Sequence, residues 1–122
     1  VCRRCGVARI LTSGGATEAM NGSANLRLLV AAAGDALQIA AGGGVSADNA
    51  ATLLRNSGVD ELHGSLRTTV PSAMQFRPKV PIYMGADKIN TPSIEFELRV
   101  TDAERVKAVV AVLGDGSSER SP

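Results

Sequence analysis

The chain has 122 residues, enough for one domain with a modest core. Its 13 lysines and arginines nearly balance its 12 acidic residues, which argues against nucleic acid or an anionic membrane surface as a partner. Aromatic residues make up 2% of the chain, so the core must be built from alanine, valine, leucine and isoleucine. No apolar run approaches the roughly 20 residues that a membrane-spanning helix needs, and we expect a soluble protein.

The N-terminal residues carry neither a secretory signal nor an initiator methionine. Val1–Arg4 is not followed by an apolar core and a small-residue cleavage site. Cys2 and Cys5 form a C-x-x-C pattern, and without an export signal we expect them to be reduced thiols in the cytoplasm rather than a disulfide. The missing methionine leads us to expect a fragment of a longer product.

The first predicted elements are a strand and a helix. Val7–Thr12 is a β-branched and aliphatic run that ends at a serine-glycine-glycine turn, which predicts a buried strand. Leucine and alanine then recur at helical spacing, and Gly34 stands where a C-terminal cap is expected. The helix is therefore predicted to begin at Thr17 or Ser23 and to end at Ala33.

A second strand and a second helix follow. Ala36–Ala40 is a short apolar run of the kind that parallel sheets bury on both faces, and it stops at a triple glycine. Ser46 is predicted to cap a helix over Ala47–Asn56, and Gly58 is predicted to end that helix in the left-handed conformation.

The remaining segments predict a third strand, a long loop and a last helix. Glu61–His63 is a short strand, and Leu66–Asn90 lacks periodicity and contains three prolines, which predicts a loop. Thr101–Glu104 matches a capping box ahead of an apolar stripe formed by Val106, Val109, Val110 and Leu113. The tail from Asp115 onward is glycine, serine and charge, which predicts disorder.

This order of elements predicts the fold class. Strand, helix, strand, helix, strand with short connections is typical of consecutive βα units in a parallel sheet. Three strands cannot close a barrel, because the eight-stranded form takes about 250 residues. The pattern therefore leaves two alternatives, a piece of an α/β barrel or a small open sheet.

Three segments of the chain stand out as motifs: R-I-L-T-S-G-G at 9–15, G-G-G-V at 42–45 with Asp48 and Asn49, and E-L-H-G-S-L-R at 61–67. In order and spacing these segments resemble proteins of the CutC family. The resemblance continues through Thr69–Phe76, Met84–Ala86 and Arg99–Ala103, and it covers roughly residues 6 to 113.

The resemblance implies a fold and a function. The family fold is a (βα)8 barrel of the TIM type, and residues 1–113 would form its last three βα units with parallel strands, followed by a disordered tail over 114–122. The implied function is copper homeostasis in the cytoplasm, with copper or a small anionic ligand bound at the C-terminal mouth of the barrel. A homo-oligomer is compatible with this role.

The glycine run is the first candidate binding site. Gly42, Gly43 and Gly44 lie between a predicted strand and a helix N-terminus, where free backbone amides can hold an anion such as phosphate. In many barrels such a site is built from the loops after strands seven and eight, which would here add Gly64 and Ser65. The alternative is a tight turn that glycine merely permits.

Other polar residues are expected at the same mouth. His63, the only histidine, ends the third strand, where it could bind metal or move protons, although a hydrogen-bonded pocket residue is the more common role. Arg67 could pair with an anion or form a surface ion pair. Thr12 and Ser13 could orient a ligand through their hydroxyls, or serve only the turn that follows them.

Copper suggests further candidates. Thiolates suit Cu(I), which makes Cys2, Cys5 and His63 candidate ligands, but two thiols lack the other ligands of a closed site. The resemblance instead places the cysteines at the ragged end of a family helix. Met74 and Met84 could add thioethers, although isolated methionines more often fill gaps.

Three functions therefore remain open from the sequence. The first is a copper-homeostasis protein of the CutC type that binds copper or a small anion. The second is a barrel enzyme acting on a phosphorylated or carboxylated metabolite, with His63 as acid or base. The third is a fragment without function of its own that is stable only when paired with another chain.

Overall fold

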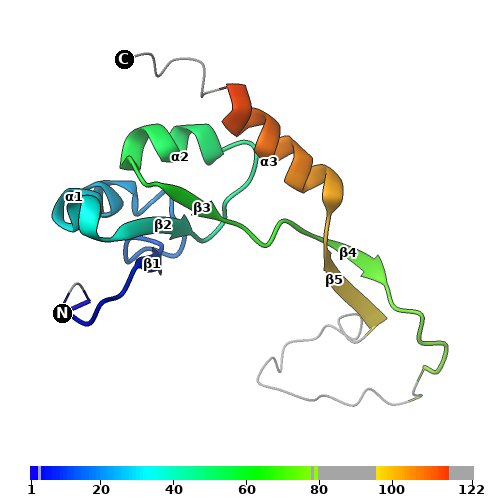
Figure 1. Ribbon diagram of the computed structural model, residues 1–122. Helices are drawn as coiled ribbons and strands as arrows, with labels where there is room; N and C mark the ends of the chain where they lie inside the picture. Colours follow the sequence, from blue (N-terminus) through cyan, green and yellow to red (C-terminus); the bar gives the residue numbers. More distant parts are fainter. Residues whose placement is uncertain (3, 78, 80–95, 116–122) are drawn as a thin grey trace.

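A computed structural model of the chain describes residues 1–2, 4–77, 79 and 96–115. The first half alternates strands and helices, and the second half adds a strand pair and a long helix (Figure 1). The elements are β1 (Arg9–Thr12), α1 (Ser23–Ala33), a 3-10 turn (Gly34–Ala36), β2 (Gln38–Gly42), α2 (Ala50–Ser57), β3 (Glu61–His63), β4 (Arg67–Pro71), β5 (Glu97–Thr101) and α3 (Ala103–Asp115).

The three predicted strands form one parallel sheet in the order β1–β2–β3. Thr12 pairs with Ala41 and Gly42 pairs with His63, so the carboxyl ends of the strands lie at one edge. The existence of the three predicted strands, their parallel direction and the helices between them are therefore confirmed. The prediction that the first strand is buried is wrong, because β1 is an edge strand whose residues alternate between exposed and partly buried. The second strand lies two residues later than predicted, because Ala36 belongs to the 3-10 turn and Gly42 pairs with β3. The structure is α/β and compatible with consecutive βα units, while a closed (βα)8 barrel stays a prediction.

One face of this sheet carries the core. Alternate strand residues point to opposite faces, and Ile10, Ile39 and Leu62 share the face that packs against the core cluster. Leu26 of α1, Ile39 and Leu53 of α2 are fully buried or nearly so. Each such side chain contributes about 1.5–3 kcal/mol when it is removed from water. The aromatic-poor core predicted from the composition is therefore aliphatic.

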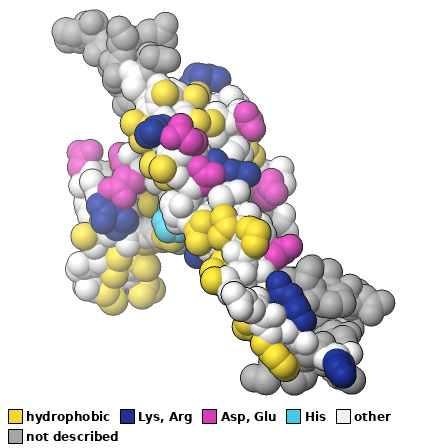
Figure 2. Space-filling model, turned by 90° about the vertical axis from the view of Figure 1, so that its right-hand side faces the viewer, with side chains coloured by type: hydrophobic (Ala, Val, Ile, Leu, Met, Phe, Trp, Pro, Cys, Tyr) yellow, Lys and Arg dark blue, Asp and Glu magenta, His cyan; other side chains and the backbone are white. Residues whose placement is uncertain are grey.

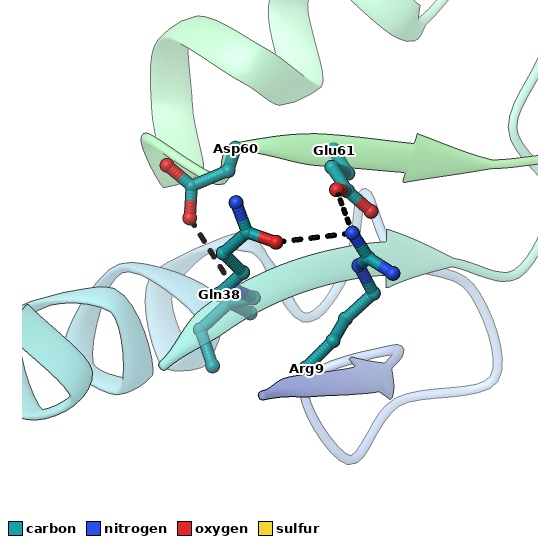
Figure 3. Close-up of polar contacts among 5 residues, drawn as sticks. Arg9, Gln38, Asp60 and Glu61 are labelled. Atoms are coloured by element: carbon teal, nitrogen blue, oxygen red, sulfur yellow. Dashed lines mark hydrogen bonds and ion pairs between the residues drawn. The ribbon is translucent and has the colours of Figure 1, made fainter. Parts of the chain in front are cut away.

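The other face of the sheet is polar at its amino end. Arg9 donates through Nη2 to Gln38 Oε1 at 3.0 Å and to Glu61 Oε1 at 2.6 Å, so one guanidinium links all three strands (Figure 3). The side chains of Arg9 and Glu61 are 54% and 37% exposed. Because solvent screens such a pair, it adds about 0.2–1 kcal/mol and mainly fixes the register.

The ends of α2 confirm one prediction and correct another. Gly58 adopts φ 69° and ψ 18°, and its amide donates to Leu54 O, as expected of a left-handed cap. The predicted side-chain cap by Ser46 is wrong, because α2 begins at Ala50 and the backbone carbonyl of Ser46 accepts from the Ala50 amide at 3.0 Å. Asn49 braces this loop instead, accepting from the Ser46 amide and donating to Gly44 O.

The start of α3 lies one residue later than the capping box predicts. Asp102 Oδ1 accepts from the amides of Glu104 and Arg105, so Asp102 is the cap. Thr101 is the last residue of β5, and its hydroxyl donates to Ser65 O at 3.3 Å. Within the predicted apolar stripe Val109 is buried, whereas Val106 and Val110 stay exposed.

The predicted loop over Leu66–Asn90 contains a strand and is wrong in that part. β4 pairs with β5 in antiparallel register, Thr69 opposite Arg99, and the pair extends away from the three-stranded sheet (Figure 1). Residues 78 and 80–90 lie outside the described residues. At the other end, α3 continues through Gly114 to Asp115, where the sequence predicted a disordered tail, and residues 116–122 are not described.

No helix within the described ranges combines the length and the apolar content required to cross a bilayer.

The turn after β1 crosses the start of α1 at backbone contact. A Cβ added to Gly22 would clash with the carbonyl oxygen of Ser13 and would lie 3.1 Å from the Cα of Gly14. Gly22→Ala is therefore expected to lower the free energy of unfolding by about 1–3 kcal/mol, measured by urea denaturation.

The matched control is Gly114→Ala, because a Cβ there meets nothing within 4 Å among the described residues. It should leave stability unchanged or raise it by up to about 1 kcal/mol. Equal stability of Gly22→Ala and the parent chain would contradict the close crossing.

Candidate functional site

The candidate site residues lie in the segments at the carboxyl edge of the parallel sheet. The register sets Thr12 at the level of Ala41 and His63 at the level of Gly42. In open and closed α/β sheets this edge is where ligands bind, because the loops that leave it converge there. The predicted residues follow β1 (Thr12, Ser13), β2 (Gly42, Gly43, Gly44) and β3 (His63, Gly64, Ser65, Arg67).

The hydroxyls of the first turn are engaged locally. Thr12 Oγ1 accepts from the Gly14 amide at 3.1 Å, and Ser13 Oγ donates to Ala16 O at 2.6 Å. Stabilisation of the turn, the alternative role that the sequence left open, accounts for both hydroxyl groups. A ligand role for Thr12 and Ser13 stays a prediction.

Gly42 and His63 lie together on the open face of the sheet. A Cβ added to Gly42 would be 2.8 Å from Leu11 Cδ1 and 3.4 Å from both Cβ and Cδ2 of His63. Glycine therefore lets these two side chains approach each other above β2. His63 is exposed, its imidazole has no hydrogen-bond partner among the described residues, and Figure 2 shows it at the surface.

A separate cavity of about 590 Å³ lies between the glycine loop and the β4–β5 pair. It brings together three of the predicted residues, Gly44, Ser65 and Arg67, with two that the sequence did not single out, Arg99 and Arg105. The other six predicted residues do not line it: Thr12, Ser13, Gly42, Gly43, His63 and Gly64. The predicted site is thus divided between this cavity, the open sheet face and the first turn.

The loop that lines the cavity has a glycine-dependent backbone. Gly43 has φ 113° and Gly44 has φ 68°, values that residues with a side chain rarely adopt. Within the described part of the chain, the amides of Gly44, Val45 and Ala47 have no hydrogen-bond acceptor. Free amides in succession are the feature that lets such loops bind anions.

The connection from β3 to β4 is strained. Leu66 has φ 44°, the one positive value outside glycine in the described residues. Branched side chains disfavour this region, at a cost of about 1–3 kcal/mol. The strained residue turns the chain so that Ser65 and Arg67, on either side of it, both line the cavity.

No ion pair within the described residues neutralises the cavity arginines. Among the described residues the two ion pairs are Arg9 with Glu61 and Lys107 with Glu104. The surface ion pair considered for Arg67 therefore has no partner there. Arg67 can bind an anion without first breaking an ion pair to any of the described residues.

The geometry of the candidate copper ligands is less favourable. No group of three or more histidine, cysteine, aspartate or glutamate residues within the described ranges could hold a metal ion. Cys2 and Cys5 are exposed free thiols at a turn, in which the Cys5 amide donates to Cys2 O. Met74 is 48% exposed, and Met84 lies outside the described residues.

Arg99 and Arg105 are the cavity residues that sequence reasoning missed. A signal was available for Arg99, because polar and apolar residues alternate over Glu97–Thr101, as in a half-buried strand. No local signal existed for their meeting Arg67, since that depends on the pairing of β4 with β5 across about thirty residues of chain.

The fold and this edge define an α/β protein of βα units with a cavity beside the carboxyl ends of its parallel strands. The CutC family model matches residues 3–68, more than half of the chain. The chain belongs to the CutC family, and the resemblance seen in its motifs is confirmed.

Curated relatives extend this similarity. A family protein CutC from Vibrio parahaemolyticus is 38% identical over 109 residues, which cover 88% of this chain and 42% of the relative. The copper homeostasis protein cutC homologs of mouse and human are 33% and 34% identical over 110 and 107 residues, covering 90% and 88% of this chain. The chain spans about two fifths of the length of these relatives.

The division of the site can be tested at Gly42. Gly42→Ala adds a methyl group against Leu11 and His63, and the flexible end of Leu11 can move aside. We expect a change in unfolding free energy below about 1 kcal/mol. In NMR spectra the imidazole signals of His63 should shift, while the amide signals of Ser65 and Arg67 stay in place.

The control is Gly114→Ala, which adds a methyl group that meets nothing within 4 Å among the described residues and should leave the imidazole signals unchanged. Amide shifts at Ser65 and Arg67 as large as those at His63 would show that the open face and the cavity are one site.

Proposed function

We propose that this chain carries the ligand-binding end of a copper-homeostasis protein and binds copper or a small anionic ligand at the carboxyl edge of its parallel sheet. Family membership supports the copper role, since relatives with most of this chain in common are named copper homeostasis proteins. The (βα)8 barrel of the family, a cytoplasmic location and reduced cysteines are parts of the same proposal.

The observation that carries the anionic alternative is the charge around the cavity. Arg67, Arg99 and Arg105 line it without ion-pair partners among the described residues. Such a surface attracts anions and repels cations. An anion is therefore the ligand that this cavity favours.

The residues best suited to bind copper lie outside this cavity. Cu(I) selects soft sulfur ligands, and the two exposed thiols of Cys2 and Cys5 are the soft pair within the described residues. His63 lies on the open sheet face and is exposed. In this proposal copper is cargo bound at the thiols or the imidazole, and the anion occupies the cavity.

The enzyme alternative gains no support from the geometry. A histidine that activates a side-chain nucleophile lies within hydrogen-bond reach of it and is commonly oriented by a third group. Within the described part of the chain, no carboxylate or hydroxyl is hydrogen-bonded to His63. Binding therefore remains the function that the site supports best.

Copper titration under reducing, oxygen-free conditions tests the cargo role. Cu(I) should bind the parent chain, and Cys2→Ser with Cys5→Ser should weaken binding by at least about tenfold, because the thiolates are the soft ligands. His63→Ala reports whether the imidazole contributes. Calorimetry with a competing chelator measures the affinities.

Met74→Leu is the matched control, since it removes an exposed sulfur without a thiol and should leave the affinity unchanged. Copper affinity that is the same in the cysteine and histidine variants would reject these residues as ligands. Absence of copper binding by the parent chain would remove copper from the proposal and leave the anion.

A further inference from the structure

We propose that the cavity beside the glycine loop binds the phosphate group of a small organic molecule, held by Arg67, Arg99 and Arg105. This inference names the ligand class for the anionic part of the proposed function and rests on that part, but it does not depend on copper. Four properties of the cavity support it: the placement of the arginines, their charge, the backbone amides and the size.

The three arginines come from three different elements. Arg67 begins β4, Arg99 lies in the middle of β5, and Arg105 is in the first turn of α3. Arg67 pairs with Thr101 and Thr69 pairs with Arg99, so Arg67 and Arg99 are diagonal neighbours on one face of the strand pair. That face lines the cavity, and Arg105 adds a guanidinium from the helix that follows β5.

The charge of the lining matches a dianion. The ionisable groups are three guanidiniums and one carboxylate, that of Asp48, which gives an excess of two positive charges. No ion pair within the described ranges reduces this excess. Guanidinium groups fit phosphate oxygens with two parallel hydrogen bonds, which a point charge cannot provide. A phosphate monoester carries close to two negative charges near neutral pH.

The backbone of the glycine loop supplies further hydrogen-bond donors. Gly44, Val45 and Ala47 line the cavity, and their amides lack acceptors in the described part of the chain. Asn49 holds this loop in shape through Gly44 O and the Ser46 amide, so the donors are fixed before a ligand arrives. Preorganised donors raise affinity because less order has to be imposed on binding.

The size of the cavity and the apolar part of its lining indicate a ligand larger than an inorganic ion. A cavity of about 590 Å³ lies in the range of small-molecule sites and far exceeds a single phosphate. Val45, Leu66 and Ala108 give part of its lining an apolar character. The arrangement suits a molecule with a phosphate at one end and a partly apolar body.

Two probes of one shape and different charge test the ligand class. Phenyl phosphate is close to a dianion near neutral pH, and phenyl sulfate is a monoanion. At low ionic strength, where screening is weak, calorimetry should show phenyl phosphate binding at least about fivefold more tightly than phenyl sulfate. Equal affinities would overturn the assignment of a dianionic group.

Three single substitutions test the residues. Arg67→Gln, Arg99→Gln and Arg105→Gln should each weaken phenyl phosphate by about tenfold or more, because each removes a charge-assisted hydrogen bond. Each arginine replaced by lysine should recover only part of the loss, since lysine keeps the charge and loses the fork. All three arginines are exposed, and thermal melts check that the variants fold.

Arg27→Gln is the matched control, an exposed arginine of α1 that does not line the cavity. Its affinity should stay within about twofold of the parent chain, as expected of a distant surface charge. A loss equal to that of the cavity variants would reduce the effect to net charge and overturn the inference.

Different results would reject the three-arginine site and the proposed binding of an anion. If phenyl phosphate binds and needs Arg67 but neither Arg99 nor Arg105, the anion role stands and the three-arginine site is wrong. If the parent chain binds neither probe nor inorganic phosphate, the anion role itself is wrong, whatever the copper titration shows.

Discussion

Parallel pairing of β2 with both of its neighbours is the constraint on which the rest of the structure depends. β2 is the one described strand bonded on both sides, and every residue of it after Gln38 is buried. Because both pairings are parallel, β1, β2 and β3 end at the same edge of the sheet. The segment that connects one strand to the next must therefore cross a face of the sheet to reach the opposite edge. That requirement places α1 and α2 on the core face and leaves the three loops at one edge.

The open face of the sheet and the edge that carries the loops differ in the contacts that their residues make. On the open face a single guanidinium, that of Arg9, ties the amino ends of the strands together, and Gly42 allows Leu11 and His63 to meet at the carboxyl end. At the edge, the strained residue Leu66 directs the chain away from the sheet into β4. The cavity exists because that turn and the cap at Asp102 return β5 and α3 beside the glycine loop. The position of the cavity thus follows from backbone geometry, and its positive charge comes from the arginine side chains that line it.

Local signals were enough for the first half of the fold. Apolar runs ended by glycine located three strands and two helices, and Gly58 was predicted correctly because the left-handed cap is a property of one residue. The cap at Ser46 was misplaced because α2 begins later, at Ala50. The capping box at Thr101 was misplaced because Asp102 accepts from the Glu104 amide that Thr101 was expected to cap. The choice between such neighbours is made by tertiary contacts, among them the bond from Thr101 to Ser65.

The second half of the fold, and part of the set of residues that line the cavity, could not be predicted from any short stretch of sequence. β4 is a strand only because β5 pairs with it, and without that partner Arg67–Pro71 looks like part of a loop. The grouping of Gly44, Ser65 and Arg67 was predicted from the resemblance to barrel proteins, and the structure places all three at one cavity. Arg99 and Arg105 were missed for the reason that hid β4, a contact between segments distant in sequence.

Chemical-shift mapping on the isotope-labelled chain tests most directly whether the glycine loop, the β3–β4 connection and the strand pair form one binding site. During a phenyl phosphate titration, the amide signals of Gly44–Asp48, Ser65–Arg67, Arg99 and Arg105 should move together along a single binding curve. Signals that move with separate affinities, or that change only on α1 and the open sheet face, would contradict the account.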